Sequence, residues 1–508
     1  MDAEQYIGIT LGPISRIMSY TQSTKSLWGA SYFMSYLGKE LVTKFFNEGR
    51  HFLKPQLEEI MWTICDGVGR FPDQYIFESQ KGDFEELLSI REKTLENLGH
   101  KIALTLNIEE EQKVVNYIKK SIKIYIYEMN QWEVSKSIVE QCQEALNAME
   151  CQDCYPISES ENYLASYFEQ INRDSLLLKD AWGELANKKL FSAIIEHSAS
   201  DAVESGILQS SELLDNEKIK SLPTAYKYIA FVAADGDNIG NALGKLGNKM
   251  SNLLLKYNQE IVQEVNANSG QVIYAGGDDL LLFAPVNSIF NLIAGIDKKF
   301  NDIISSSPEV MAELKKEKLT IPTLSFGLSI SYYKHPMSES LQLAESLLEE
   351  AKDKGRNRIV WNMRKHSGQS IKSSFFKGHA EIFKYAIQLI DKFQKRIKNN
   401  EEDKTEDKKD NDTIFLHSVS HYLLQHQEIL NHILSEDTPA KIAAELKNYM
   451  DSTFEDDEHE KHKESLESFR EYLQSIAELE GKENEAIKKM HALLKFIELL
   501  ISKKEESV

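Results

Sequence analysis

The hydrophobic pattern of residues 223–370 switches between strand-like runs and helical spacings. Four apolar runs predict strands: Tyr226–Ala234, Gln271–Ala275, Leu280–Val286 and Thr323–Tyr332. Apolar residues recur every three or four positions over Asn238–Asn266 and Val286–Ile304, which predicts helices, and another helix follows Ser338 and closes at Gly355. The order βαββαβ, with one extra helix, predicts a ferredoxin-like domain.

The rest of the chain divides into three further regions. Residues 1–150 carry two β-prone runs, Tyr6–Thr10 and Lys123–Met129, and a helical pattern that reaches about Phe46. We interpret this region as a second α+β domain. Residues 151–222 are predicted to be a helical connector, and residues 371–508 an all-helical C-terminal domain. The predicted fold class is therefore α+β.

The composition of the chain indicates where in the cell the protein is expected and which partners it can bind. The chain has 508 residues, of which 42% are hydrophobic, so global disorder is excluded. No apolar run approaches the roughly 18–20 residues of a membrane helix, and the N-terminus lacks signal-peptide features, so we expect a cytoplasmic protein with no membrane contact. The net charge of −21 argues against free-standing binding to a nucleic-acid backbone, but it permits contact through partner subunits.

Carboxylates stand at two matching places in the predicted second sheet. Asp235-Gly236-Asp237 ends the first strand, and Gly276-Gly277-Asp278-Asp279 forms the hairpin tip. Because these strands are neighbours in a βαββαβ sheet, the acids should converge on one edge, where two Mg²⁺ or Mn²⁺ ions could bind. The two glycines of the tip would let a phosphate chain approach the backbone. Ordinary turn chemistry explains either motif alone, but not both together.

Two cations close the last predicted helix of this region. Lys352 and Arg356 are four residues apart and share a face, so they could reach the β- and γ-phosphates of a nucleotide. Favourable placement of cations at a helix C-terminus is the alternative explanation.

Four segments together resemble a known family: AADGDNIG, YAGGDDLLLFAP, SFGLSISYYKHP and AKDKGRNRIVW. They are similar to the cyclase palm of the large, polymerase-like subunit of type III CRISPR effector complexes, most closely the Cmr-type branch. The N-terminal segment LGPISRIMSYTQSTKSLWGASYFMSYL resembles the first palm of the same subunit. The two matches occur in the family's order.

The resemblance implies an ATP-using nucleotidyltransferase for antiviral defence that is activated when its complex binds target RNA. ATP would lie between two palm (nucleotidyl cyclase) domains and be converted into cyclic oligoadenylate, a second messenger. Guide RNA and target RNA would be held mainly through other subunits. By matched motif, the metal and catalytic role falls on Asp235, Asp278 and Asp279. The nucleotide-binding role falls on Gly236, Asp237, Gly276, Gly277, Ser325, Lys352 and Arg356.

Departures from the family pattern leave alternatives open. The chain has no His-Asp dipeptide, so we expect no HD nuclease. Ser26 stands where the first palm often has Asp, which leaves the acceptor undecided: some relatives join AMP to S-adenosylmethionine instead. A scaffold with an inactive palm is the third reading. The family often binds zinc between its palms; here Cys142, Cys151 and Cys154 could supply three ligands of the usual four, and free thiols are the alternative.

Overall fold

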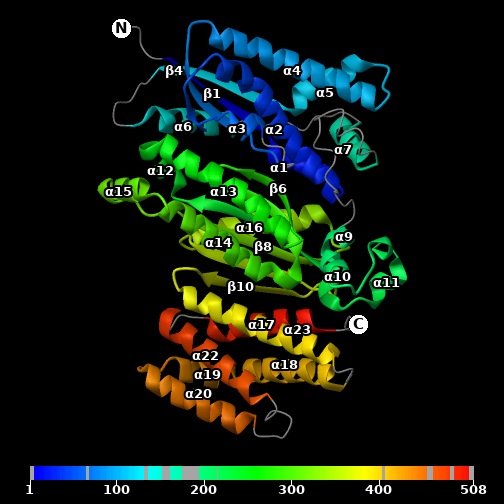
Figure 1. Cartoon of the computed structure of the whole chain (residues 1–508), viewed down its shortest axis with the longest axis vertical. Helices are drawn as coiled ribbons and strands as arrows, with labels where there is room; N and C mark the ends of the chain where they lie inside the picture. Colours follow the sequence, from blue (N-terminus) through cyan, green and yellow to red (C-terminus); the bar gives the residue numbers. More distant parts are fainter. Residues whose placement is uncertain are drawn as a thin grey trace.

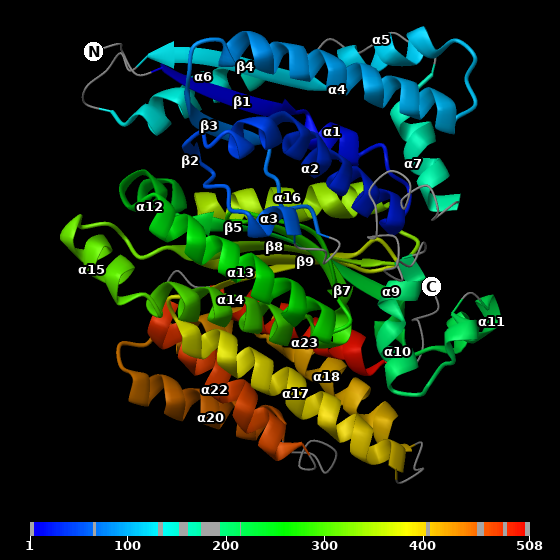
Figure 2. The same ribbon diagram turned by 45° about the horizontal axis from the view of Figure 1, so that its top comes forward.

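The protein's elements are stacked in three tiers, seen from top to bottom in Figure 1 and after a tilt in Figure 2. The computed structural model describes residues 5–63, 68–130, 136–151, 161–173, 194–213, 215–402, 407–454, 462–480 and 485–502. A first sheet with its helices forms the top tier, a second sheet with its helices the middle one, and C-terminal helices the lowest. Among the described helices, none combines the length and the apolar character that a bilayer span requires. The predicted α+β class with C-terminal helices is confirmed.

The first sheet has the strand order β2-β3-β1-β4, and all its neighbouring strands are antiparallel. This is the order of a βαββαβ unit. Its strands are β1 (Gln5–Gly12), β2 (Phe52–Lys54), β3 (Gln74–Ser79) and β4 (Lys123–Asn130). Its helices are α1 (Ile14–Met18), α2 (Thr24–Asn47), α3 (Ile60–Thr63), α4 (Asp83–Thr105), α5 (Glu111–Ser121) and α6 (Ile138–Glu150). We call these elements the first domain.

The second sheet has the strand order β10-β9-β8-β5-β7-β6. Its strands are β5 (Tyr228–Asp237), β6 (Gln271–Gly276), β7 (Asp279–Pro285), β8 (Thr323–Tyr332), β9 (Arg358–Arg364) and β10 (Ser370–Phe376). Its helices are α12 (Ile239–Leu246), α13 (Asn248–Ala267), α14 (Ile289–Ser305), α15 (Pro308–Lys316) and α16 (Met337–Asp353), and η4 (Val286–Ser288) is a 3₁₀ turn. We call these elements the second domain. The helix predicted over Asn238–Asn266 is divided because Gly247, at φ +49°, lies between α12 and α13.

The two faces of strand β5 pack against different tiers. Ile229 and Phe231 belong to the apolar cluster that the second domain shares with the first. Ala230 and Val232 point to the other face, toward α13, α14 and the C-terminal helices. Such a strand, buried on both faces, reads as a continuous apolar run, which is how Tyr226–Ala234 appears in the sequence.

Helices of the chain between the two sheets pack against both domains. Helix α7 (Tyr163–Arg173) packs on α2, and α9 (Ile194–Ser198) lies against β5 and β7. The elements that follow are α10 (Ser200–Glu204), η2 (Ser210–Glu212), α11 (Asn216–Ser221) and η3 (Thr224–Lys227). Within residues 151–222, the described part is thus helical.

The C-terminal region begins with a strand, which corrects the expectation that residues 371–508 are helical throughout. Strand β10 crosses that boundary, since Ile371 and Phe375 pack into the second domain's core, and the helices start only at Ala380. They are α17 (Ala380–Glu402), α18 (Asp407–Gln425), α19 (Gln427–Leu434), α20 (Pro439–Thr453), α22 (Lys463–Glu480) and α23 (Ala486–Ile501). Phe290 of α14 contacts Phe496 of α23 edge to face, so one core runs through both tiers.

Helix α16 packs against strand β8 at Gly327 with almost no gap. A Cβ there would lie 2.0 Å from the backbone oxygen of Ala344 and 2.3 Å from the backbone nitrogen of Leu348. We expect Gly327→Ala to lower the free energy of unfolding by about 1–3 kcal/mol, because backbone atoms cannot rotate away as a side chain can. Thermal unfolding of the full chain measures it.

The control for that substitution is Gly244→Ala in helix α12. A Cβ at Gly244 meets nothing within 4 Å. Because alanine is the better helix former, this variant should be neutral or more stable by about 0.5–1 kcal/mol. Equal unfolding temperatures for the two variants would contradict the tight contact at Gly327.

Candidate active site between the two domains

Strand β5 and the β6–β7 hairpin bring the predicted carboxylates together, as the sequence pattern indicates. Asp235 follows Ala234, which pairs with Leu280 of β7, so the end of β5 lies beside the hairpin tip. Asp278 packs directly against Gly236: a Cβ at Gly236 would lie 2.7 Å from the Cβ of Asp278. Asp279 and Asp235 lie close enough for the charge of Asp235 to raise the pKa of Asp279.

The hairpin tip depends on one glycine and one buried amide. Gly277 has φ +62°, a conformation that a residue with a side chain rarely adopts. The Nδ2 group of Asn258, on α13, donates a hydrogen bond of 3.1 Å to the backbone oxygen of Gly277. Together they fix the direction in which Asp278 and Asp279 leave the turn.

The environment of the carboxylates disfavours three negative charges. Burial, with the nearby charge of Asp235, raises the pKa of Asp278 to about 7. Burial and the charges of Asp278 and Asp235 also raise the pKa of Asp279 well above its ordinary value. Asp279 keeps accessible surface and lines two cavities that are walled by both domains. Such a group favours a bound cation or protons.

The carboxylates can bind Mg²⁺ or Mn²⁺ only if a substrate supplies further ligands. Within the described ranges, nowhere do three His, Cys, Asp or Glu side chains converge closely enough to hold a metal ion as they stand. Mg²⁺ is commonly bound by one or two carboxylates, with phosphate oxygens and water completing its octahedron. The acids of raised pKa fit that mode, in which a nucleotide brings the missing ligands.

Lys352 forms an ion pair with one of the acids. Its Nζ lies 2.6 Å from Oδ2 of Asp235, so a cation distant in sequence offsets part of the negative charge of the site. Arg356, predicted to act with Lys352, is exposed at φ +64° and lines neither of the two cavities described below.

Asp237 and Ser325 form a hydrogen bond with each other, whereas the sequence predicted that both contact the nucleotide. The Asp237 carboxylate accepts hydrogen bonds from Ser325 Oγ at 2.9 Å, Thr323 Oγ1 at 2.7 Å and the Asn357 backbone nitrogen at 2.9 Å. Both side chains are buried, and neither lines a cavity described below. Asp237 therefore ties β5 to β8 and to the turn after α16.

A cavity of about 360 Å³ opens at the hairpin tip, between the domains. We call it the carboxylate cavity. Its second-domain wall includes Asp235, Asn258, Gly276, Gly277, Asp278 and Asp279, and its first-domain wall includes Lys54, Arg70 and Asp73. No sequence motif marks these first-domain residues, because only the packing of the domains brings them here.

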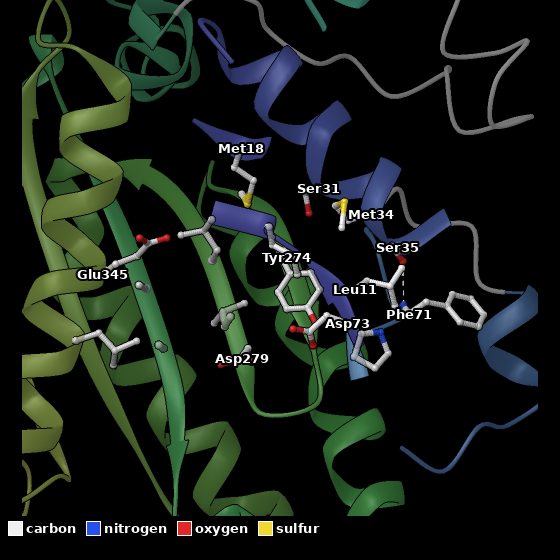
Figure 3. A pocket seen from close by; sticks show the side chains of 17 residues that line it. Leu11, Met18, Ser31, Met34, Ser35, Phe71, Asp73, Tyr274, Asp279 and Glu345 are labelled. Carbon is white, nitrogen blue, oxygen red and sulfur yellow. Dashed lines mark hydrogen bonds between the residues drawn. The ribbon is translucent and has the colours of Figure 1, made fainter. Parts of the chain in front are cut away.

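An adjoining cavity of about 320 Å³ lies on the other side of the hairpin. Asp73, Tyr274 and Asp279 line both cavities, and Figure 3 shows these three side chains close together. The other walls of the adjoining cavity are mostly apolar and include Met18 and Met34 from the first domain. Glu345 faces this cavity from α16.

The domain interface that forms both cavities is specific. Ser31 Oγ of α2 donates a hydrogen bond of 2.9 Å to the backbone oxygen of Ile273 in β6. Gly69 also pairs with Tyr274 as a parallel β-bridge, so a first-domain loop extends the edge of the second sheet.

The cysteines do not match the zinc prediction. Cys142 is buried in an apolar cluster, 2.8 Å from the sulfur of Met129, and burial raises the pKa of its thiol to about 12. A zinc ligand is a thiolate, which that environment opposes. Cys151 is exposed, and Cys154 lies outside the described residues.

Comparison with known proteins agrees with this architecture. Residues 228–360 match the family model "Cas10/Cmr2, second palm domain". The CRISPR system Cmr subunit Cmr2 of Pyrococcus furiosus is 27% identical over an alignment covering 33% of this chain and 24% of that protein. The chain thus aligns with about a quarter of the length of this curated relative.

One solved structure shows a similar fold over most of the chain. A type III-B Cmr-beta structure in the apo state has a TM-score of 0.56 at 12% identity, covering 88% of this chain and 77% of that one. A Csm1–Csm4 cassette in complex with cA4 has a TM-score of 0.39 at 15% identity, with 76% and 58% covered. The matched residues 228–360 contain the carboxylates of β5 and of the hairpin, and we conclude that this part of the chain is a palm domain of the Cas10/Cmr2 type.

Proposed function

We propose that this chain is a metal-dependent nucleotidyltransferase of a type III CRISPR effector complex, which converts ATP into a nucleotide second messenger. The observation that carries the proposal is the convergence of Asp235, Asp278 and Asp279, with raised pKa values at Asp278 and Asp279, on a cavity between two α+β domains. The match to the palm-domain family supports the same reading. Target RNA, guide RNA and partner subunits would reach the chain within that complex.

Each residue has a role set by its position. Asp235, Asp278 and Asp279 would hold Mg²⁺ or Mn²⁺, which when bound screens the triphosphate and polarises its phosphorus atoms. Gly276 and Gly277 leave the backbone open to the phosphate chain. The 3′-hydroxyl of one nucleotide attacks the α-phosphorus of another, the bond to pyrophosphate breaks, and the hydroxyl proton is lost to solvent. The two cavities that meet at Asp279 can hold donor and acceptor side by side.

A cationic acceptor is the second candidate, and the adjoining cavity favours it. Burial raises the pKa of both Asp73 and Glu345, so each carboxylate gains from a cationic ligand. The sulfonium and ammonium groups of S-adenosylmethionine are such cations, and the apolar walls suit its methionine carbons. AMP transfer to that acceptor would give a linear conjugate instead of a cyclic oligoadenylate.

One experiment tests both versions. The assembled complex is incubated with target RNA, Mg²⁺ or Mn²⁺ and labelled ATP, with and without S-adenosylmethionine, and the products are identified by mass spectrometry. Oligoadenylates under both conditions support the first version, and a conjugate that requires S-adenosylmethionine supports the second. ATP left unchanged in every condition would refute both and leave the scaffold role.

A further inference from the structure

A lysine of the first domain faces the carboxylate cavity from the side opposite the acids. Lys54 ends strand β2 and lines the cavity together with Gly276, Gly277 and Asp278. It is half-buried, and the negative charges that act on it most are those of Asp278 and Asp73. Its ammonium group therefore lies in the field of the site.

No carboxylate within the described part of the chain pairs with Lys54. The ion pairs found there, with nitrogen–oxygen distances up to 4.0 Å, do not include it, whereas Lys352 lies 2.6 Å from Asp235. Burying a cation without a close counter-ion is costly, and its pKa is accordingly lowered by burial. Binding of an anion from outside the chain would offset that cost.

The cavity's two walls suit a polyphosphate, not a simple anion. Three acids on the second-domain wall repel an anion unless metal ions intervene. The first-domain wall carries two cations, Lys54 and Arg70, and one acid, Asp73. A nucleoside triphosphate has enough charge to bind metal ions on one side and an ammonium group on the other. The open backbone of Gly276 and Gly277 lies between these walls.

The cations predicted from sequence do not fill this role as they stand. Lys352 is engaged by Asp235, and Arg356 lies outside the cavity. A cation that faces the phosphates from the wall opposite the metal-binding acids must therefore be a residue that no sequence motif marks.

We propose that Lys54 is a substrate-positioning residue that binds the phosphate chain of a nucleoside triphosphate held between the two domains. The assignment rests on the proposed function and extends it, because it makes the first domain a direct contributor to triphosphate binding. An ammonium group acts on phosphate as a point charge, so it can keep its contact while the phosphate chain moves during the reaction.

Nucleotide binding to the full-length protein tests the assignment without requiring turnover. AMPPNP with Mg²⁺ is titrated into wild type, Lys54→Met and Lys54→Arg in a calorimeter. Loss of one charged hydrogen bond predicts binding about 10- to 100-fold weaker for Lys54→Met, with substantial recovery in Lys54→Arg. In the assembled complex the same loss should raise the KM for ATP more than it lowers kcat.

Controls separate a binding role from a structural one and from the proposed function itself. Lys81→Met removes the same charge from an exposed turn of the first domain, and it should bind AMPPNP as wild type does. Unfolding temperatures of all variants should agree with wild type. Wild-type affinity in Lys54→Met, or equal weakening in Lys54→Arg, would overturn the role of Lys54 alone. Absence of AMPPNP binding by wild type would overturn the proposed function, and the role of Lys54 with it.

Discussion

Replacing Asp278 and Asp279 together by alanine is expected to lower product formation from ATP by at least about 10³-fold. These residues leave the hairpin tip toward Asp235, and the pair supplies most of the negative charge that can hold metal ions in the carboxylate cavity. Loss of a single electrostatic group at a reaction centre already costs about 10²- to 10³-fold. The rate of labelled product formation by the assembled, RNA-activated complex measures the effect.

The same double variant should leave the fold intact. Burial raises the pKa of both acids, so their charges oppose folding when no cation is bound, and alanine removes that opposition. We therefore expect an unfolding temperature equal to or above that of wild type without metal, and a smaller rise on adding Mn²⁺.

A charge-matched control excludes a general electrostatic effect. Asp302→Ala with Asp353→Ala removes two exposed acids from the second domain and should keep wild-type activity. Products formed at the wild-type rate by the Asp278–Asp279 variant would show that these residues do not hold the catalytic metal ions.

Local patterns were sufficient to predict the four strands β5–β8 of the second domain and the convergence of its acids, whereas strands β9 and β10 were not predicted. The apolar run of β5 ends at Asp235, and the two runs of the hairpin are separated by Gly277-Asp278. Since strand order follows from the βαββαβ sequence of elements, the meeting of Asp235 with the hairpin follows as well.

Residues on the same strand could not be assigned to different roles from the pattern alone. Asp235 and Asp237 are two positions apart, and strand alternation places them on one face. The structure pairs Asp235 with Lys352 and surrounds Asp237 with Ser325, Thr323 and Asn357. Which acid meets the cavity depends on the turn that follows α16, and sequence alternation does not describe that turn.

The first-domain wall of the site was not predictable from sequence for a different reason. Lys54 and Asp73 lie about two hundred positions before the hairpin and carry no motif. They reach the cavity because Ser31 and Gly69 attach the first domain to strand β6. Contacts between domains leave no periodic pattern of apolar residues, so they cannot be predicted from a single sequence.

Gly236 separates Asp235 from Asp237, and the structure gives a steric reason for glycine there. A Cβ would lie 2.4 Å from Cγ1 of Ile239, 2.7 Å from Cβ of Asp278 and 3.0 Å from its Oδ2. Rotation of Ile239 can relieve the first contact, but the Cβ of Asp278 moves only with its backbone, so the hairpin tip must shift away from β5.

Gly236→Ala is therefore expected to displace the Asp278 carboxylate and to lower the rate of product formation by about 10²-fold, the usual cost of misplacing a reacting group by about 1 Å. The destabilisation should be about 1–3 kcal/mol, because the hairpin tip and the Ile239 side chain must both move. Initial rates and unfolding temperatures are measured beside Gly244→Ala, whose Cβ meets nothing within 4 Å. Equal rates for the two variants would mean that the hairpin tip tolerates a shifted Asp278, and the close packing of Gly236 against it would then have no catalytic purpose.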